Sequence, residues 1–247
     1  MKTALVTGAA RRIGRALALE AAKAGYAVAI HHRDAAEDAS RLAAEIEAGG
    51  GRAAVIAADL NDRSSPESLI TQAALALGPV SLLVNNASLF ADDRLGELGE
   101  DWDRHFDVNL RAPVFLAQAF AKALPAGVDG LIVNILDQRV WRPNPQFFSY
   151  TLTKSALWTA TQTMAQALAP RIRVNGIGPG PTLASIHQTQ ADFAAESQNV
   201  PLQRSASPEE IAAALRYLID APSVTGQMIA VDGGQHLAWR TPDIIGT

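Results

Sequence analysis

Two residues that could move a proton, Tyr150 and Lys154, lie four positions apart in the sequence. On a helix, positions i and i+4 share one face, so the phenol and the ammonium group would lie side by side. A lysine cation beside a phenol stabilises the phenolate and lowers the pKa of the tyrosine. We therefore expect Tyr150 to exchange a proton near neutral pH, with Lys154 as its partner. An isolated pair with this spacing would more often be an accident of a helix surface.

Further polar side chains follow short apolar runs that are typical of strands. Asn85 and Asn86 end one such run, and Asn134 and Asp137 end a later one, with Asn109 between them in the sequence. Ligands bind at the carboxyl ends of the strands in parallel sheets. We therefore expect these groups to lie near one ligand, together with the Tyr150 pair.

A turn bounded by glycines follows the first apolar run, and it could bind a pyrophosphate. Residues 7–14 read Thr-Gly-Ala-Ala-Arg-Arg-Ile-Gly, and a helical pattern begins at Gly14. Small residues let the backbone approach phosphate oxygens, and the helix N-terminus favours their charge. The middle glycine of the strict dinucleotide motif is missing, and Arg12 stands where a third glycine is expected. The residues expected to contact the cofactor here are Gly8, Arg11, Arg12, Ile13 and Gly14.

The end of the second predicted strand distinguishes the two nicotinamide cofactors. An NAD site usually has Asp or Glu there to bind the ribose 2′-hydroxyl. Here His32 occupies that position and Arg33 follows it. Arg33 can pair with a 2′-phosphate, so we expect NADPH, although Asp34 would repel that phosphate if it pointed inward. The other interpretation is a solvated strand end. A metal site is disfavoured, because adjacent strand residues point to opposite faces.

The elements that must position these groups alternate along the chain. Short apolar runs predict strands at residues 3–6, 27–30, 53–57, 82–84, 131–135, 173–177 and 227–231. Helical patterns lie at residues 14–24, 37–48, 66–77, 102–124, 149–169 and 208–220. Continuous apolar strands alternating with helices indicate a parallel sheet covered on both faces. We expect an α/β chain with one doubly wound, Rossmann-type domain and a seven-stranded parallel sheet.

Composition excludes several other classes. The 247 residues are 48% hydrophobic and 19% charged, with a net charge of −4 and no cysteine. This excludes disulfides and thiolate catalysis, and it argues against nucleic-acid binding. We see neither a signal peptide nor a membrane-spanning run, and expect a cytoplasmic protein without a metal site. We expect residues 1–247 to form one domain, with a lid over the substrate at 181–200 and a C-terminal tail at 239–247.

Taken together, these motifs resemble the short-chain dehydrogenases/reductases over essentially the whole chain. The resemblance rests on residues 7–14, Asp59-Leu60, Asn85-Asn86-Ala87, Asn109, Tyr150 with Lys154, Gly178-Pro179-Gly180 and Val231-Asp232-Gly233-Gly234. It implies that Asp59 and Leu60 lie near the adenine and that Lys154 binds the nicotinamide ribose. It also implies that Asn109 holds a water in a proton relay with Lys154. The further cofactor contacts expected are Asn86, Ala87, Pro179, Gly180 and Thr182.

Asp137 departs from the family pattern, which usually has a serine that steadies a substrate carbonyl. An ionised aspartate would face a developing alkoxide. At about 4 Å and an effective dielectric constant of about 20, the two charges repel by roughly 4 kcal/mol. Simple ketone reduction therefore requires a protonated Asp137. A substrate that offers N–H groups suits a carboxylate better.

Within the family, the chain is similar to the pteridine reductases. They share the loop pattern of Thr7, Gly8, Arg12 and Gly14, the aspartate at Asp137, and Asn-Asn-Ala-Ser followed by Phe90. The similarity implies that Phe90 stacks on a pterin ring, with Ser88 and Arg12 contacting the pterin or the cofactor phosphates. An aromatic face is a good platform for a planar heterocycle. The alternatives are that Phe90 is a core residue, that Arg12 caps a helix and that Asp137 is structural. Trp141, Thr182, Leu183 and His187 are further residues that could line the pocket.

We therefore expect NADPH-dependent reduction of a pterin C=N bond, of a dihydropterin or dihydrofolate type. Tyr150 donates the proton, assisted by Asp137 and Lys154, and Ser88, Phe90, Asp137 and Tyr150 contact the substrate. One alternative is a carbonyl reductase acting on a 3-oxoacyl substrate or another ketone. A more remote one is a sensor that binds NADP without catalysis. The family resemblance also implies a homotetramer.

Overall fold

The computed structural model describes residues 2–185 and 188–239. Within these residues, seven parallel strands form one sheet in the order β3-β2-β1-β4-β5-β6-β7. The strands span Lys2–Val6 (β1), Tyr26–His32 (β2), Ala53–Ala57 (β3), Val80–Asn85 (β4), Gly130–Ile135 (β5), Ile172–Pro179 (β6) and Met228–Val231 (β7). The predicted fold class is confirmed, and each predicted strand is present with small shifts at its ends.

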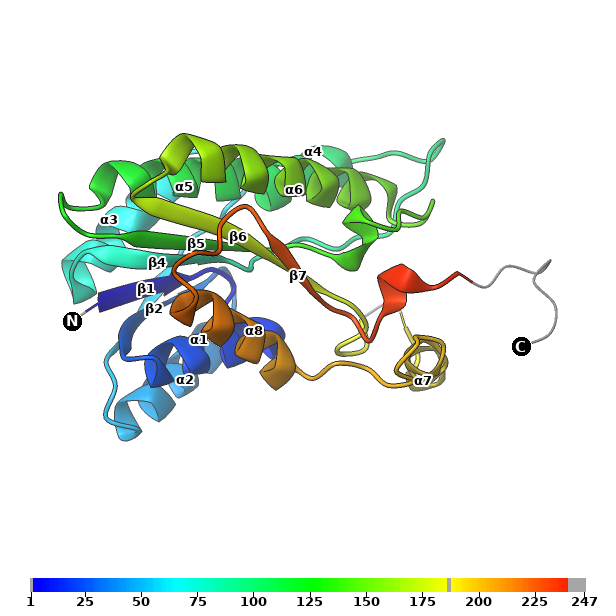
Figure 1. The fold of residues 1–247 in the computed structure, drawn as a ribbon, viewed down its shortest axis with the longest axis horizontal. Helices are drawn as coiled ribbons and strands as arrows, with labels where there is room; N and C mark the ends of the chain where they lie inside the picture. The colour runs from blue at the N-terminus through cyan, green and yellow to red at the C-terminus, as the bar shows by residue number, and fades with distance from the viewer. Residues whose placement is uncertain (1, 186–187, 240–247) are drawn as a thin grey trace.

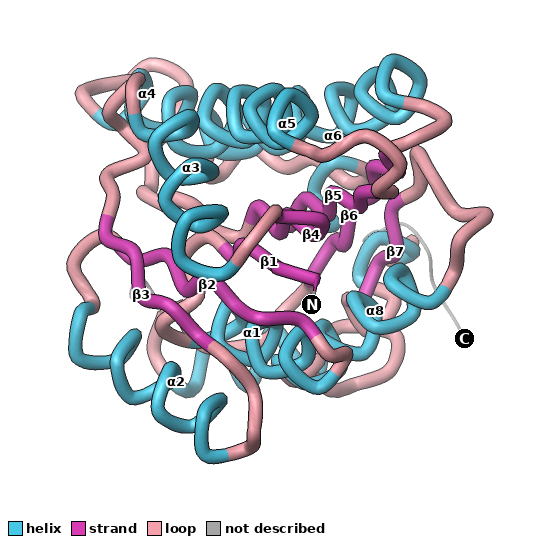
Figure 2. Tube along the Cα trace, turned by 90° about the vertical axis from the view of Figure 1, so that its left-hand side faces the viewer, coloured by secondary structure: helices cyan, strands magenta, loops and turns pink. Residues whose placement is uncertain are grey.

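Helices cover both faces of the sheet. They span Arg12–Lys23 (α1), Ala36–Ala48 (α2), Ser65–Leu77 (α3), Asp101–Phe106 (α4), Ala112–Ala123 (α5), Phe148–Leu168 (α6), Gln190–Gln198 (α7) and Pro208–Asp220 (α8). Figure 1 shows α1, α2 and α8 below the sheet and α3, α5 and α6 above it. The same two layers enclose the sheet in the perpendicular view of Figure 2.

The strands are mostly apolar because both of their faces are buried. In β1, Ala4 and Val6 pack into the cluster that includes Leu17 of α1. Leu5, which points to the other face, joins the cluster that includes Leu69 of α3 and Leu116 of α5. Alternate side chains of one strand therefore supply two cores. A strand with one solvated face would carry polar residues at every second position instead.

The order of the strands places a crevice between β1 and β4. The chain runs outward from β1 through β2 to β3, and then returns to β4 on the other side of β1. Loops leaving β1 and β4 therefore diverge at the carboxyl edge of the sheet. That edge is the ligand-binding position of open parallel sheets.

The single long helix expected at residues 102–124 is interrupted. Between α4 and α5 the chain forms a π-helical turn, η1 (Asp107–Arg111), which contains Asn109. The sequence pattern does not reveal this turn, because its apolar periodicity continues through it. Turns of this kind are rare and occur often at functional sites.

The expected lid at 181–200 contains a helix that was not predicted. Helix α7 begins with a capping box in which Thr189 and Asp192 exchange side-chain and backbone hydrogen bonds. His187 lies outside the described residues, as do residues 240–247 of the expected tail. No helix in the described ranges has the length and apolar character needed to cross a membrane.

Candidate active site

Two adjoining cavities lie at the carboxyl edge of the sheet. The first, of about 520 Å³, is lined by the loop after β1, the ends of β2 and β3 and the segment after β4. The second, of about 760 Å³, extends from Asn86 to the lid and contains Asp137, Tyr150 and Lys154. Arg12, Ile13, Asn86 and Ser88 line both cavities. A ligand that fills the first therefore reaches the groups of the second.

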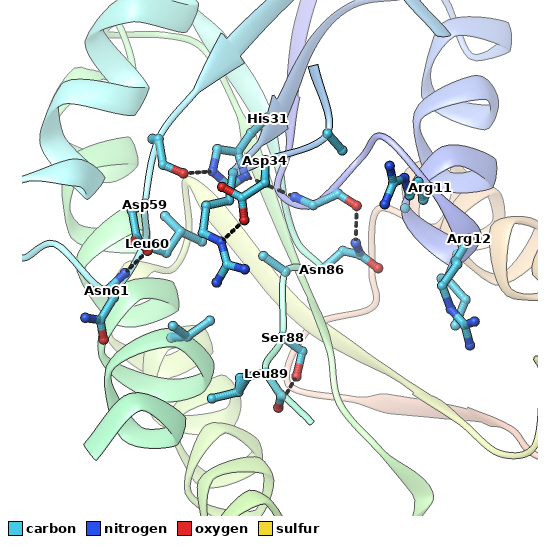
Figure 3. A pocket seen from close by; sticks show the side chains of 18 of the residues that line it. Arg11, Arg12, His31, Asp34, Asp59, Leu60, Asn61, Asn86, Ser88 and Leu89 are labelled. Atoms are coloured by element: carbon cyan, nitrogen blue, oxygen red, sulfur yellow. Dashed lines mark hydrogen bonds and ion pairs between the residues drawn. The ribbon is translucent and has the colours of Figure 1, made fainter. Parts of the chain in front are cut away.

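The loop after β1 is folded tightly against Asn86. Gly8 has a φ of +61°, and a Cβ on Gly14 would lie 2.1 Å from the carbonyl oxygen of Gly8. Asn86 Nδ2 donates hydrogen bonds to the carbonyls of Thr7 and Gly8, at 2.9 and 3.0 Å. The Thr7 hydroxyl accepts from the amides of Asn86 and Ala87. Asn86 therefore shapes the loop, as Figure 3 shows.

Helix α1 opens into the first cavity without a cap. Arg11 at its N-cap makes no side-chain capping bond, and its first turn contains no acidic residue. Arg12 adopts a left-handed conformation with a φ of 53°. The first amides of a helix have no partner within it, and they carry a partial positive charge. This N-terminus therefore fits the phosphates of a dinucleotide.

His31, rather than His32, lines the first cavity. Its Nδ1 accepts from the amide of Gly8 at 3.0 Å, and its Nε2 donates to the carbonyl of Ala58 at 3.1 Å. Burial lowers the pKa of His31 to about 4, so the ring is neutral at neutral pH. His32 is also buried, and its Nδ1 has no hydrogen-bond partner within the described residues. The sequence analysis placed His32 at the cofactor-facing position. Adjacent strand residues face opposite ways, so an error of one position along the strand exchanges the two histidines.

Three arginines around this cavity have acquired specific partners. Arg33 forms an ion pair with Asp34, and both side chains line the cavity. Arg11 pairs with Asp38 of α2. Arg12 donates to the carbonyls of Leu183 and Ala184 in the lid, at 3.1 and 3.0 Å. The loop after β1 is therefore linked directly to the lid.

The other predicted cofactor residues divide between the two cavities. Asp59 and Leu60 line the first, and Figure 3 shows them opposite Arg11 and Arg12. Ala87 lines the first cavity as well, whereas Pro179, Gly180 and Thr182 line the second. An extended ligand that contacts all of them would run along the carboxyl edge of the sheet.

The proton-transfer groups meet in the second cavity. The Tyr150 hydroxyl donates to Asp137 Oδ2 at 2.9 Å, and Asp137 Oδ1 accepts from the amide of Arg139 at 2.8 Å. Lys154 Nζ donates to the carbonyl of Ile135 at 2.7 Å, and it lies 5.6 Å from the centroid of the Tyr150 ring. Tyr150 and Lys154 share one face of α6, as their spacing predicts.

The predicted lowering of the tyrosine pKa is wrong. Burial, and then the Asp137 carboxylate, raise the pKa of Tyr150 well above its usual value. Burial lowers the pKa of Lys154 to about 8. Burial also raises the pKa of Asp137, against the hydrogen bond from the Arg139 amide. The spacing alone does not reveal that Lys154 donates to the backbone carbonyl of Ile135, or that the Tyr150 hydroxyl donates to the Asp137 carboxylate.

Asn109 lies fully buried in the π-helical turn η1. Its Oδ1 accepts from the amide of Leu89 at 2.7 Å and from the Ser88 hydroxyl at 3.1 Å. Its Nδ2 donates to the carbonyl of Leu89 at 2.9 Å. Asn109 therefore orients the segment after β4 in this structure. Its expected relay with Lys154 through a water stays a prediction.

Phe90 lies in the second cavity, where it has an aromatic neighbour that the sequence analysis missed. Its ring stacks on Phe147 with 4.1 Å between centroids and an interplanar angle of 15°. It meets Tyr150 edge to face at 4.7 Å. The Arg139 guanidinium lies 5.1 Å from the centroid of Phe147. The adjacent phenylalanines at positions 147 and 148, directly before Ser149, were the sequence signal that could have indicated an aromatic partner for Phe90.

Comparison with known proteins is consistent with this geometry. The family model described as "Enoyl-(Acyl carrier protein) reductase" matches residues 8–236. A solved structure of FolM alternative dihydrofolate reductase 1 from Brucella suis, in complex with NADP, is 54% identical with a TM-score of 0.95. The similarity covers 99% of this chain and 98% of that one.

More distant relatives have other names. A short-chain dehydrogenase from Burkholderia cenocepacia in complex with NADP is 34% identical, with a TM-score of 0.89, over 96% of this chain and 98% of that one. A 3-oxoacyl-[acyl-carrier-protein] reductase from Synechocystis is 33% identical over 94% of this chain and 96% of its own length. The Brucella and Synechocystis proteins are therefore both named reductases, of different substrates, and the Burkholderia protein is named a dehydrogenase.

Proposed function

The chain belongs to the short-chain dehydrogenase/reductase family, and we propose that it is an NADPH-dependent reductase that acts on a C=N bond of a pterin. The hydrogen bond from Tyr150 to Asp137 carries this proposal, because it places a carboxylate where the family usually has serine. A carboxylate accepts N–H groups of a heterocycle but repels a developing alkoxide. The 54% identity to a protein named alternative dihydrofolate reductase supports the same substrate class.

The cofactor side of the site fits NADP. The uncapped N-terminus of α1 suits the pyrophosphate, and the tight Gly8–Gly14 contact brings backbone amides toward it. Arg33 supplies a cation at the end of β2 for a 2′-phosphate. Lys154, on the floor of the second cavity, is the group we assign to the nicotinamide ribose. When bound, NADPH supplies the hydride.

Three side chains of this chain provide the proton. The buried Tyr150 hydroxyl donates to Asp137 in this structure, and it donates to the substrate nitrogen once its O–H turns from the carboxylate to the substrate. After the transfer, Asp137 can take up a proton from solvent, because burial raises its pKa, and pass it to the phenolate along the same contact. Lys154 keeps a positive charge behind the phenol, which opposes the cost of a transient phenolate. Holding these groups in place supplies the orientation that the reaction needs.

Phe90 and Ser88 are the proposed substrate contacts. Both line the second cavity beside Asp137 and Tyr150. The stack of Phe90 on Phe147 presents a broad aromatic wall, and a flat heterocycle can pack against such a wall. Arg12, which links the cofactor loop to the lid, lies on the path between the two ligands.

A carbonyl reductase is the second candidate, and one observation favours it. Burial raises the pKa of Asp137, and a protonated carboxyl can donate to a carbonyl as the family serine does. The relative named 3-oxoacyl-[acyl-carrier-protein] reductase gives the corresponding substrate class. The two candidates require opposite protonation states of Asp137 when the substrate binds.

NADPH oxidation with a dihydropterin, with dihydrofolate and with a panel of ketones separates them when wild type is compared with Asp137→Ser. We expect pterin-dependent oxidation in the wild type and a loss of about 10²-fold or more in the variant, typical of a missing acid–base group. Asp129→Ser, an exposed carboxylate next to the amino end of β5, is the matched control and should keep full activity. Ketone reduction that rises in Asp137→Ser, without pterin turnover in either protein, contradicts the pterin proposal.

We also propose that the protein is a homotetramer. Phe115 on α5 and Leu152 on α6 expose 47% and 39% of their surfaces, and both helices lie in the upper layer of Figure 1. Apolar side chains of this size are favoured at subunit contacts. Light scattering would then give four times the chain mass of 26.1 kDa.

A further inference from the structure

The segment at residues 88–94 forms one wall of the second cavity. Ser88, Phe90, Asp92 and Arg94 all line it, at every second position. The intervening residues Leu89, Ala91 and Asp93 have backbone groups bonded to η1, α4 and α6. This alternation is that of an extended chain with one face on the protein and one on the cavity. We call residues 88–94 the substrate wall.

His105 of α4 holds the middle of the substrate wall. It is fully buried, and its Nε2 lies 3.1 Å from the amide nitrogen of Ala91. Its Nδ1 lies 2.6 Å from the Ser149 hydroxyl. Because the amide can only donate, Nε2 must accept and therefore carries no proton. In a neutral ring the proton is then on Nδ1, which donates to Ser149.

Ser149 connects this contact to the proton donor. It lies in the first turn of α6 and directly precedes Tyr150. The N-cap of that helix, Phe147, has a left-handed φ of 52° and no side-chain capping bond. Asp93 of the substrate wall takes over this function, because its Oδ1 accepts from the Ser149 amide at 3.0 Å. The carbonyl of Asp93 also accepts from the Phe148 amide at 3.2 Å.

We propose that His105 is a positioning residue that ties the substrate wall to the start of α6, so that Phe90 and Tyr150 keep one relative placement. It acts only as the neutral ring that accepts from Ala91 and donates to Ser149. The inference rests on the proposed reductase site but not on a pterin as its substrate. The Phe90 ring meets Tyr150 edge to face at 4.7 Å, so a shift of the wall changes the surroundings of the proton donor directly.

Protonation of His105 breaks this arrangement. A charged imidazole has two N–H groups, so Nε2–H would face the N–H of Ala91. The groups around the ring are Asp93 on the wall, Asp101 and Arg104 on α4, and the hydroxyl of Ser149 and ring of Tyr150 on α6. Burial outweighs the two carboxylates and lowers the pKa of His105. The contact is therefore complete at neutral pH and is lost on acidification.

Two amide variants separate the two bonds of the ring. In His105→Gln, the side-chain oxygen can reach the place of Nε2 and accept from Ala91. In His105→Asn, the shorter side chain reaches only the place of Nδ1, so it keeps a bond to Ser149 and leaves the Ala91 amide without an acceptor. Both remove the titratable ring, and both keep a polar group in the same buried site.

Hydrogen exchange at the Ala91 amide measures the strength of its hydrogen bond to His105, and it requires no substrate. We expect fast exchange in His105→Asn, slow exchange in His105→Gln, and a loss of protection in the wild type at acid pH beyond the intrinsic effect of pH. Thr3→Val is the matched control, because it removes a buried hydrogen bond to Leu77 at the opposite edge of the sheet. It should change global stability without changing exchange at Ala91.

Kinetics with whichever substrate the protein turns over completes the test. We expect the substrate KM to rise about five- to tenfold in His105→Asn, as for one lost hydrogen bond, with the Kd for NADPH unchanged. The wild-type KM should rise on acidification, and the Gln variant should have the wild-type KM at neutral pH without that rise. Equal exchange and equal KM values in the Gln and Asn variants overturn the proposal, as does a matching loss of NADPH binding. Absence of pterin turnover alone contradicts only the proposed substrate.

Discussion

The protonation state of each residue in this site depends on its burial and on the groups beside it. Tyr150 and Lys154 have the spacing of a catalytic pair, but the phenol donates to Asp137 while Lys154 donates to a backbone carbonyl. Burial then raises the pKa of Tyr150 and lowers that of Lys154 to about 8. The phenol is consequently protonated at neutral pH. In the proposed mechanism, the carboxylate beside it decides which substrate atom can receive that proton.

Asp34 is the residue at which cofactor preference can be changed. It pairs with Arg33 at the edge of the first cavity, where its carboxylate competes with a 2′-phosphate for the guanidinium. We expect Asp34→Ser to lower the Kd for NADPH by about threefold, the scale of an exposed ion pair, and to leave the Kd for NADH unchanged. Titration of nucleotide fluorescence measures both constants.

Arg33→Ala provides the opposite change to compare with Asp34→Ser. It should weaken NADPH binding and spare NADH, since only the 2′-phosphate requires the cation. An equal gain for both nucleotides in Asp34→Ser would show that Asp34 has no part in the distinction.

At the scale of elements, the loop after β1 (residues 7–14) and the segment after β4 leave neighbouring strands and are joined by hydrogen bonds. Asn86, the first residue after β4, bonds to the carbonyls of the loop after β1. Asn109 in the turn η1 then orients Leu89 a few residues further on. The π-helical geometry of η1 places this amide inward, between α4 and α5. Both ligand sites therefore depend on the same junction.

Gly14→Ala tests that junction. The new Cβ would lie 2.1 Å from the carbonyl oxygen of Gly8 and 2.6 Å from Asn86 Nδ2, so the loop must open. We expect the free energy of unfolding to fall by about 2 kcal/mol, in the range of overpacked sites, and NADPH binding to be lost. Urea denaturation and nucleotide titration measure the two effects.

Gly49→Ala is the control for Gly14→Ala. Gly49 follows α2, and a Cβ there would meet the carbonyl oxygen of Ile46 at 3.4 Å, an ordinary contact. Stability and NADPH binding should both stay close to those of the wild type. Retained NADPH binding in Gly14→Ala would contradict the tight loop that the structure shows.

At the scale of the whole molecule, the doubly wound sheet brings loops from both halves of the chain to one edge. Three strands lie on one side of the crevice, and β4 to β7 lie on the other. The β1 loop reaches across to the lid through Arg12, which bonds to Leu183 and Ala184. His31 contributes at the same edge by joining the Gly8 amide to the carbonyl of Ala58 after β3. A change that weakens the His31 contacts should therefore lower the stability of the fold and also disturb the loop after β1.

The free energy of unfolding should depend on pH through the titration of His31. Its pKa in the folded state is about 4, below the ordinary 6.5, so folding favours the neutral ring. This contribution is complete above pH 6.5 and is lost as the pH falls from 6.5 to about 4. The shift corresponds to roughly 3 kcal/mol, and the residue is too buried for solvent to screen it.

His31→Asn isolates this effect, because the amide can still accept from Gly8 but does not titrate. We expect urea denaturation to show a loss between pH 7 and pH 4 that is roughly 3 kcal/mol larger in the wild type than in the variant. Carboxylate titration affects both proteins equally. Parallel pH profiles would assign the acid sensitivity to other groups.

The sequence by itself determined the order of the strands and named most of the residues that were expected in the site and that line the two cavities. Apolar runs identified each strand, because parallel strands buried on both faces consist mostly of apolar residues. The four-residue spacing of Tyr150 and Lys154 set their common helix face. The departure at Asp137 is the basis of the proposed substrate class. Each of these inferences needs only local periodicity or the type of one residue.

Tertiary structure alone decided which groups meet. It placed His31 instead of His32 against the cofactor loop, stacked Phe90 on Phe147, and turned Lys154 toward Ile135. It also raised the pKa of Tyr150 where the spacing predicted a lower value. These outcomes depend on burial and on distances between segments far apart in the chain. Neither quantity is contained in a local pattern, because both arise only when the two helical layers close over the sheet.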